Sequence, residues 1–436
     1  MNATLPASRD FVALSRRFLD VLGADGLGDE GDQQLLAVDG IEPRWVLRPA
    51  SAEQAQKALA ICAAHDLSVV PAGLGLRLPQ GNPPTRLDAV LSTSRMDRIV
   101  EHAVDDLTAT FEAGATLAAV NARLGASRQC LPFDPALPTE TTIGGLLAAN
   151  ASGPSRQAFG TAREWLLGVR AALADGTLVK SGGRVVKNVA GYDVHKLLVG
   201  SFGTLAVILE ATFKLQPLPE ATRLLTFAAP ELDPLFRLAT VLADAPLAPR
   251  FVEILVESDT SPRLVTGFAG VVEEVEESGR RALATAEGLG IEADSKSIAD
   301  GGLHGWLQAF ALGRDTAVVL RAGVRRDAVH RWLTEALAES QSVARAVCAH
   351  AHAGVGVARV RLDGSERERL PELVASLRGA AVRAGGSLVV EAAPAAWKPA
   401  LDVWGPPGPG FPLMRGVKAA FDPRGLLAPG RFVGGL

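Results

Sequence analysis

The stretch LPTETTIGGLLAANASGPSRQAFG, residues 137–160, decides which fold this chain of 436 residues adopts. It has no charged side chain between Glu140 and Arg156, and Gly, Ala, Ser and Thr dominate it. Small side chains let backbone amides approach a large planar ligand, while a few hydroxyls and one amide, that of Asn150, can orient it. A buried helix packed through small residues would have the same composition, so the rest of the chain must decide between the two interpretations.

Composition narrows the class of protein. Apolar residues make up 48% of the chain and charged residues 21%, which is typical of a folded protein, and the length indicates two or three domains. The net charge of −4 and the lack of a run rich in Lys and Arg argue against nucleic acid as a partner. The three cysteines, Cys62, Cys130 and Cys348, fit a reducing compartment and are too few to hold an iron–sulfur cluster with four thiolates.

The N-terminal segment, residues 1–39, has the pattern of a polar lead-in to an amphipathic helix. It has no long apolar core after a basic start, so the sequence predicts neither a signal peptide nor a membrane span. We therefore expect a cytoplasmic protein that reaches the inner face of the membrane, at most, peripherally and through partners.

The remainder of the chain divides into three segments. Residues 40–221 combine short β-runs with a helix that Ser51 would cap, which predicts one α+β body. Residues 222–395 alternate charged helical pieces with β-runs such as FVEILVES, which predicts a second domain of mixed α/β type. Residues 396–436 begin with the turn-rich linker WGPPGPGFP and end in a helix and a loop, and we expect them to pack back on the first body.

A glycine-rich loop, PAGLGLRLPQG at residues 71–81, follows the second predicted strand. Its glycines permit positive φ, and consecutive backbone N–H groups in such a loop can hold a pyrophosphate. The pattern lacks both the GxxxxGK[ST] loop and the third glycine of the dinucleotide fingerprint, so neither of those motifs is present. Taken alone, the loop is also compatible with a tight turn.

The order of these segments resembles the FAD-binding domain of the vanillyl-alcohol oxidase / p-cresol methylhydroxylase (VAO/PCMH) type. The glycine-rich loop comes first, EAGATL at residues 112–117 follows, and GTLAVI at residues 203–208 ends the pattern. Between them lie the matched positions Pro138, Thr142, Gly144, Gly145, Asn150 and Gly153. The resemblance implies an α+β fold, with a two-part PCMH-type FAD-binding domain at residues 40–221 and a cap-like second domain.

Three stretches, at residues 141–156, 182–215 and 403–435, are similar to the FAD-binding E subunit of bacterial glycolate oxidase. That resemblance implies an FAD-binding subunit of a complex that oxidises glycolate to glyoxylate, with a sister flavoprotein and an iron–sulfur subunit as partners. One departure is Ala428, which stands where the family usually has Asn before its final PGR motif.

The resemblance also implies a cofactor site. Backbone amides of the glycine-rich loop would hold the pyrophosphate, and the small-residue stretch would line the flavin and its ribityl arm. Some relatives attach the flavin through a His in this loop, but GLGLRL has neither His nor Cys, so we predict non-covalent FAD. The residues implied for FAD are Ala72, Gly73, Leu74, Gly75, Leu76, Arg77, Pro138, Thr142, Ile143, Gly144, Asn150, Ser152, Gly153 and Val207.

Relatives that oxidise D-2-hydroxy acids carry a GHxGDGNxH-type segment, which supplies histidines for a metal and for proton abstraction. The matching stretch is CAHAHAGVGVARVRL, residues 348–362, in which His352 and the two glycines after it agree. Val355, Val357 and Arg359 stand in place of the Asp, the Asn and the final His. We therefore predict a strand without a metal, on which His350 and His352 share one face.

Other catalytic candidates are weak. Tyr192, Asp193 and His195 could shuttle protons near a flavin, or form a satisfied hydrogen-bond network at the start of a helix. A first alternative function is a stand-alone FAD-dependent D-2-hydroxy-acid dehydrogenase with His195 or His304 as its base. A second alternative is an assembly scaffold that has lost FAD. A third is the UDP-sugar enolpyruvyl reductase of the cell wall, but the sequence shows no pattern for a nucleotide-sugar site.

Overall fold

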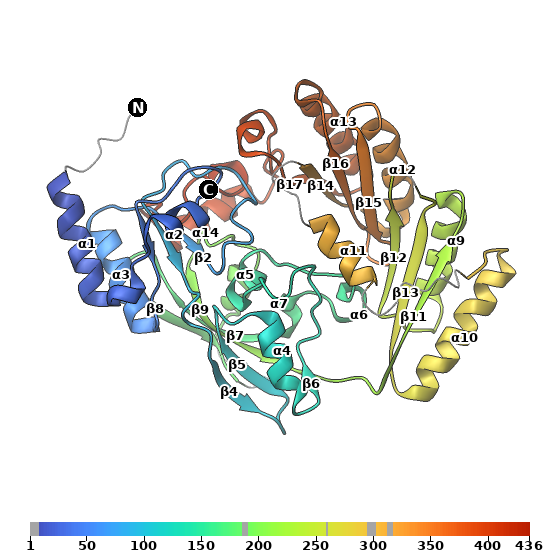
Figure 1. Ribbon diagram of the computed structural model, residues 1–436, viewed down its shortest axis with the longest axis horizontal. Helices are drawn as coiled ribbons and strands as arrows, with labels where there is room; N and C mark the ends of the chain where they lie inside the picture. Colours follow the sequence, from blue (N-terminus) through green and yellow to red (C-terminus); the bar gives the residue numbers. More distant parts are fainter. Residues whose placement is uncertain (1–7, 185–190, 259, 294–301, 312–316) are drawn as a thin grey trace.

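The computed structural model describes residues 8–184, 191–258, 260–293, 302–311 and 317–436. The chain forms two bodies that lie side by side, each built on its own β-sheets, and the C-terminal segment returns to the first of them (Figure 1). The first body contains two main sheets and the second contains one large sheet.

A small parallel sheet starts the first body. Its strands are β1 (Trp45–Leu47), β2 (Val69–Ala72) and β3 (Ala89–Ser92), in the order β1-β3-β2. Helix α3 (Ala52–Ala64) connects the parallel strands β1 and β2, as such a crossover requires. Ser51 caps α3 as the sequence predicts, since its hydroxyl accepts a hydrogen bond from the Gln54 N–H at 3.2 Å. Helices α1 (Ser8–Leu22) and α2 (Glu30–Leu35) precede the sheet.

An antiparallel sheet of five strands forms the rest of the first body, in the order β4-β5-β9-β7-β8. Alternate residues of β9 face opposite sides, so Leu209 packs with α1 and α3 while Ile208 packs with α5. Helices therefore cover both faces of the sheet. The strands are β4 (Ile99–Ala103), β5 (Thr108–Glu112), β7 (Leu166–Ala172), β8 (Leu178–Gly182) and β9 (Val207–Lys214). The helices between them are α4 (Leu117–Gly125), α5 (Ile143–Ala148), α6 (Arg156–Phe159), α7 (Ala162–Trp165) and α8 (His195–Leu198), and β6 (Gln129–Cys130) pairs with β10 (Gln216–Pro217).

The second body is a seven-stranded antiparallel sheet in the order β11-β13-β12-β15-β16-β14-β17. Four helices cover one of its faces and bury a large apolar core, in which the Trp332 indole donates to the Leu377 carbonyl at 3.2 Å. The strands are β11 (Ala221–Ala228), β12 (Phe251–Val256), β13 (Arg263–Gly270), β14 (Ala317–Gly323), β15 (Ala346–His352), β16 (Val357–Asp363) and β17 (Ser387–Ala392). The helices are α9 (Leu232–Asp244), α10 (Val272–Gly288), α12 (Val329–Ser340) and α13 (Leu370–Arg383).

The other face of this sheet turns toward the first body. Helix α11 (Gly302–Ala311) lies on that face, where Leu303 and Leu307 pack against β12 and β13 (Figure 1). Functional side chains that point from this face therefore meet the first body.

The C-terminal segment packs on the first body after α14 (Phe411–Phe421). The Val69 N–H donates to the Leu426 carbonyl at 2.8 Å, and the Ala428 N–H donates to the Val69 carbonyl at 2.9 Å. Ala428 adopts a φ of 46°, a left-handed conformation that Asn tolerates better than most residues, so the backbone here would suit the Asn that the resemblance implies.

The structure confirms the predicted α+β class, because helices and largely antiparallel sheets are combined in both bodies. In the part of the chain that the structure describes, each helix is too short or too polar to cross a bilayer.

Candidate flavin site

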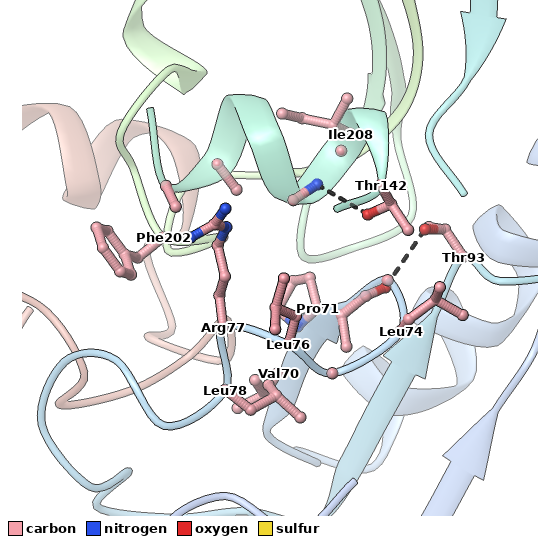
Figure 2. A pocket seen from close by; sticks show the side chains of 18 of the residues that line it. Val70, Pro71, Leu74, Leu76, Arg77, Leu78, Thr93, Thr142, Phe202 and Ile208 are labelled. Carbon is pink, nitrogen blue, oxygen red and sulfur yellow. Dashed lines mark hydrogen bonds between the residues drawn. The ribbon is translucent and has the colours of Figure 1, made fainter. Parts of the chain in front are cut away.

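The glycine-rich loop leaves β2 and passes directly beside the start of α5. The Thr142 hydroxyl caps α5 by accepting from the Gly145 N–H at 3.1 Å. A Cβ on Gly73 would lie 2.2 Å from the Thr142 hydroxyl oxygen, so only glycine allows the loop to approach this closely. Figure 2 shows the loop and the helix facing each other across a cavity.

This first cavity is lined mainly by small or apolar residues and by backbone. Three segments supply them: residues 70–78, residues 140–149 and residues 202–208. Thr93 and Arg431 add single side chains. The chain thus brings together the loop and the two stretches whose order carried the family resemblance, although residues 79–201 lie between the first and the last of these segments (Figure 2).

Two buried cations stabilise the end of the glycine-rich loop by donating hydrogen bonds to its carbonyl groups. The Arg431 guanidinium donates to the carbonyls of Leu78 at 2.7 Å and Gln80 at 2.5 Å. The Lys398 ammonium donates to the Pro79 carbonyl at 2.5 Å and pairs with Asp39 at 2.5 Å. Burial lowers the pKa of Arg431 to about 10, and it lowers the pKa of Lys398 as well. The C-terminal segment thereby fixes the path of the loop.

Two further cavities adjoin the first one, at the border between the two bodies. The second is lined by residues 135–137 and 151–154, by α11, and by His350, His352 and Arg359. The third is lined by Asn150, Ser152 and several arginines. Arg77 lines all three cavities, so together they form an elongated site that runs from the glycine-rich loop to the second body.

Most residues expected to hold FAD line this elongated site. The residues at the first cavity are Ala72, Gly73, Leu74, Gly75, Leu76, Arg77, Thr142, Gly144 and Val207, and those at the neighbouring cavities are Asn150, Ser152 and Gly153. Two of the expected residues do not line it. Ile143, the first residue of α5, is fully buried in the core, and the carbonyl of Pro138 accepts from the Ala118 N–H at 3.1 Å.

Asn150, which lines the third cavity, has an unusual environment. Its φ is 46°, and its Oδ1 is buried without a hydrogen-bond partner among the described residues. Because an unpaired buried amide oxygen costs about 1–3 kcal/mol, such an atom indicates a missing partner. A bound ligand with a donor group would satisfy it.

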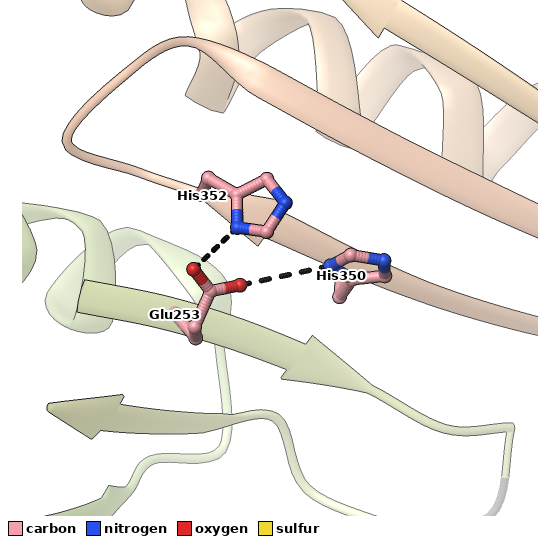
Figure 3. A group of neighbouring side chains, drawn as sticks. All are labelled: Glu253, His350 and His352. Atoms are coloured by element: carbon pink, nitrogen blue, oxygen red, sulfur yellow. Dashed lines mark hydrogen bonds and ion pairs between the residues drawn. The ribbon is translucent and has the colours of Figure 1, made fainter. Parts of the chain in front are cut away.

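A buried cluster of three side chains stands at the second cavity, where β12 and β15 are neighbours. Figure 3 shows the Glu253 carboxylate facing both His350 and His352. Glu253 Oε1 lies 2.5 Å from His352 Nδ1, a short hydrogen bond, whereas Glu253 Oε2 lies 3.6 Å from His350 Nδ1, which is too far for one. All three side chains are at most 5% exposed.

Arg359 on β16 determines the protonation of His352. One terminal nitrogen of its guanidinium lies 3.1 Å from His352 Nε2, and its Nε lies 2.7 Å from Glu391 Oε2. A guanidinium only donates hydrogen bonds, so His352 Nε2 must accept. The proton of the neutral ring then sits on Nδ1 and is donated to Glu253. The result is a chain of hydrogen bonds from Glu253 through His352 and Arg359 to Glu391.

Glu253, His350 and His352 also have the residue types of a metal site, since their ligand atoms lie within 4.8 Å of one another. The contact with Arg359 does not fit that interpretation. A metal on His352 Nδ1 would move the proton to Nε2, where it would face the N–H of Arg359, donor against donor. The arrangement therefore fits a hydrogen-bonded chain better than a metal centre.

Burial dominates the acid–base behaviour of the cluster. It raises the pKa of Glu253 to about 7. It lowers the pKa of His350 to about 4 and that of His352 to about 3, and the positive charge of Arg359 contributes to both. Both imidazoles are therefore neutral and weakly basic at physiological pH.

Sequence reasoning found His350 and His352 but missed Glu253 and Glu391. Both acids stand alone in otherwise apolar strands, FVEILV and SLVVEA, and each is at most 14% exposed. A single carboxylate inside such a run is a usable signal, because a buried charge is retained only where it has a partner.

The other weak candidates lie elsewhere. His195 and Tyr192 line a different cavity, next to β8 and α14. His195 is buried and lies 3.1 Å from the Ser181 hydroxyl, while Tyr192 is 93% exposed, so the structure does not join them into a proton-transfer cluster. The side chain of His304 lies outside the described residues.

Comparison with known proteins agrees with this geometry. The model of the FAD binding domain matches residues 43–182, and the model of the C-terminal domain of FAD linked oxidases matches residues 323–432. Among solved structures, p-cresol methylhydroxylase with substrate bound has a TM-score of 0.78 at 16% identity, and the match covers 98% of both chains. This likeness confirms the expected two-part fold.

Several curated proteins are similar in sequence. D-lactate dehydrogenase of Archaeoglobus fulgidus is 30% identical over 420 residues, 92% of this chain and 93% of that protein. Glycolate oxidase subunit GlcD of Bacillus subtilis is 26% identical over 454 residues, 96% of each. Glycolate oxidase subunit GlcE of Escherichia coli is 38% identical over 125 residues, which are 28% of this chain and 36% of that protein.

The fold, the elongated site and these matches define a flavoprotein with a PCMH-type FAD-binding domain. The chain belongs to the FAD-linked oxidase family, among its 2-hydroxy-acid oxidases and dehydrogenases, and its cofactor is FAD.

The residues present fit this cofactor. The glycine-rich loop offers backbone at the first cavity, and the small side chains around Gly144 leave room for a planar group. The unpaired Oδ1 belongs to Asn150, which lines the adjoining third cavity. Held by these residues, FAD would supply an acceptor for a hydride or for electrons at the border of the two bodies.

Proposed function

We propose that this chain is the FAD-binding subunit of a glycolate oxidase complex, which oxidises glycolate to glyoxylate. In this proposal a sister flavoprotein removes the hydride from glycolate, an iron–sulfur subunit passes the electrons on, and the flavin of this chain is structural or relays electrons. The similarity to GlcE and GlcD, both named as subunits of glycolate oxidase, supports it.

One observation carries the proposal. Oxidation of a hydroxy acid requires a base with a suitable pKa next to the substrate. The lone pair of His352 Nε2 accepts from Arg359, and the pKa of His352 is about 3. Of the two histidines that line the second cavity, His352 is thus engaged, and burial also lowers the pKa of the other, His350, to about 4. Two weakly basic histidines suit a subunit that does not itself deprotonate the substrate.

Further features agree with a role inside a complex. The three cysteines are free and lie far apart in sequence, so clusters would have to come from another chain. Among the described residues, those that line the first cavity include no His or Cys, which supports non-covalent FAD. We place the complex in the cytoplasm, with any membrane contact made through its partners.

Expression of the chain with and without the two proposed partners tests this function. Alone, we expect the chain to purify with FAD and to reduce no dye when glycolate or D-lactate is added. Together with the partners, it should co-purify with them and support glycolate-dependent dye reduction. Failure to co-purify, or full activity of the chain alone, would overturn the proposal.

A stand-alone D-2-hydroxy-acid dehydrogenase is the second candidate. The near-complete match to a D-lactate dehydrogenase favours it, and so does Glu253, because a pKa of about 7 suits general acid–base catalysis through His352. The same dye assay on the isolated chain decides between the candidates. A scaffold without FAD is disfavoured, since the residues of the first cavity fit the cofactor.

A further inference from the structure

A further cavity lies apart from the cofactor site, beside the edge strand β8 of the five-stranded sheet. It has a volume of about 580 Å³, and its walls come from β7, β8, α8 and α14. In the described part of the chain it shares no lining residue with the three cavities that form the elongated site. We call this space the α8–α14 groove.

The floor of the groove is apolar and uncharged. Leu173, which follows β7, and Val179 on β8 are half-buried there, at the margin of the apolar core around α5. His195 is buried beside them, and because burial and the charge of Lys196 lower its pKa, its ring is neutral at physiological pH. The apolar face of a sheet is normally covered by another layer, so the helical layer over β7 and β8 is incomplete at this point.

Exposed apolar side chains extend the groove on both sides. Tyr192 and Val194, which line it just before α8, are 93% and 37% exposed. On α14, Leu413, Gly416 and Ala420 are exposed and lie three and four residues apart, so they share one side of the helix. Ala420 lines the groove and Leu413 is 78% exposed, so this side of α14 continues the apolar surface over about two helical turns.

This surface is formed by two of the stretches that carry the resemblance to the glycolate oxidase E subunit. Tyr192 and Val194 belong to residues 182–215, and Leu413 and Ala420 belong to residues 403–435. In the described structure these side chains do not line the cofactor site, so FAD binding does not explain them. A continuous exposed apolar surface that includes a tyrosine is typical of a protein–protein interface.

The charges at the rim of the groove indicate the chemistry of its occupant. Lys180 lines the groove and is exposed, and Arg415 on α14 is exposed with its guanidinium 5.6 Å from the centre of the Phe411 ring. Within the described residues neither cation forms an ion pair, and Asp193 is an exposed acid of the same surface. The excess of cations favours acidic groups on the molecule that docks.

We propose that the α8–α14 groove receives an amphipathic helix of a partner subunit, with apolar residues on its inner face and acidic residues on its flanks. A helix fits because the incomplete layer lies between two helices, on a sheet face that α5 covers elsewhere. Tyr192 and Leu413 would pack against its apolar face, and Lys180 would pair with its acids. This inference rests on the proposed role in a complex and names the face through which that complex assembles.

Co-expression of the full chain with the sister flavoprotein and the iron–sulfur subunit tests the groove. Leu413→Asp places a charge in the contact, and the helix tolerates it because an acid in the first turn suits the helix dipole. We expect Leu413→Asp and Tyr192→Ser each to weaken partner binding about tenfold or more. Val382→Asp, at a 61% exposed position of α13, is the matched control and should bind the partners as wild type does.

The outcomes distinguish this proposal from the proposed function. Both variants should keep the FAD content and melting temperature of the wild-type chain, and a loss of either would mean that the residue serves the fold, contrary to the proposal. If the wild type co-purifies with its partners and Leu413→Asp and Tyr192→Ser do so equally well, the groove is not the interface and the complex stands. If the wild type binds neither partner, the complex itself is wrong and the groove proposal fails with it.

A photo-reactive benzophenone side chain in place of Leu413 identifies the occupant. We expect the cross-linked peptide to come from a partner subunit and to carry apolar residues three and four apart with Asp or Glu beside them. A cross-link to a second copy of this chain, or to a basic segment, would overturn the proposal. Lys180→Gln should reduce the salt dependence of partner binding, whereas Lys57→Gln, at an exposed site of α3, should leave it unchanged.

Discussion

Arg359 donates a hydrogen bond to Nε2 of His352 at 3.1 Å and so takes the lone pair with which this histidine could accept a proton or bind a metal. The same guanidinium pairs with Glu391, and the histidine in turn donates to Glu253. A fixed positive charge thus stands at the border of the two bodies. The cluster therefore holds the guanidinium of Arg359 in a fixed position.

Removing this cation should restore the basicity of His352. In Arg359→Leu, His352 Nε2 loses its hydrogen-bond donor and the positive charge that repels a protonated imidazole disappears. The negative charge of Glu391 stays nearby and favours protonation. The pKa of His352 should therefore rise from about 3 by about 1–3 units. Histidine NMR signals recorded across a pH titration measure this change. Arg326→Leu, at an exposed arginine paired with Asp244, is the control and should leave the titration of His352 as it is.

The close approach of the glycine-rich loop to α5 predicts a sharp effect of one methyl group. In Gly73→Ala the new Cβ would lie 2.2 Å from the Thr142 hydroxyl oxygen, so the loop must move away and FAD affinity should fall by at least about tenfold. The FAD content after purification and the dissociation constant by fluorescence check this. Gly125→Ala is the matched control, because a Cβ at this position would meet no atom within 4 Å. This variant should bind FAD normally, and its free energy of unfolding should be equal or higher. Unchanged FAD binding by Gly73→Ala would contradict the assigned loop.

The sequence allowed prediction of the parts that depend on local pattern. The cap at Ser51, the small-residue stretch around Gly144 and the glycine-rich loop could each be placed from residue type and order. Such features rest on short-range chemistry, since a hydroxyl caps the helix that follows it and a glycine permits the turn in which it stands.

The cluster at the second cavity could not be predicted in this way. Glu253 and His352 are 99 residues apart and meet because β12 pairs with β15. Arg359 meets Glu391 over a separation of 32 residues, although β16 and β17 are separated by β14 in the sheet. Strand order is set by the packing of the whole domain, which residue spacing does not report.

The bracing of the loop by the C-terminal segment gives a third prediction. Arg431→Met leaves the carbonyls of Leu78 and Gln80 without their buried donor, which costs about 1–3 kcal/mol per unpaired group and loosens the loop. We expect weaker FAD binding and a lower melting temperature of the FAD-free protein. Arg424→Met is the control, since Arg424 contacts the Ala63 carbonyl away from the loop, and it should retain normal FAD binding. Equal FAD affinity of both variants would show that the brace has no role in the site.

The pKa of Glu253 gives a pH-dependent prediction whose sign is fixed. A carboxyl whose pKa is raised to about 7 from 4.5 binds more protons in the folded state than in the unfolded one, so it stabilises the fold fully below pH 4.5 and this contribution is lost as pH rises to 7. The buried histidines have the opposite effect, because their pKa values in the folded state, about 4 and about 3, lie below the ordinary value of 6.5. The stability that they contribute to the fold is present above pH 6.5 and is lost as the pH falls toward these folded values.

Replacement of Glu253 by Gln isolates the contribution of this carboxyl to the pH dependence of the unfolding free energy. Glu253→Gln keeps the shape and can still accept from His352, but it does not ionise. The unfolding free energy of this variant, relative to wild type, should therefore increase by about 1.4 kcal/mol per pH unit between pH 4.5 and 7. Urea unfolding at a series of pH values measures it, and Glu273→Gln at an exposed site of α10 should give a curve parallel to that of wild type. If the difference between Glu253→Gln and wild type is constant with pH, Glu253 is ionised alike in both states, and the neutral hydrogen-bonded cluster must be abandoned.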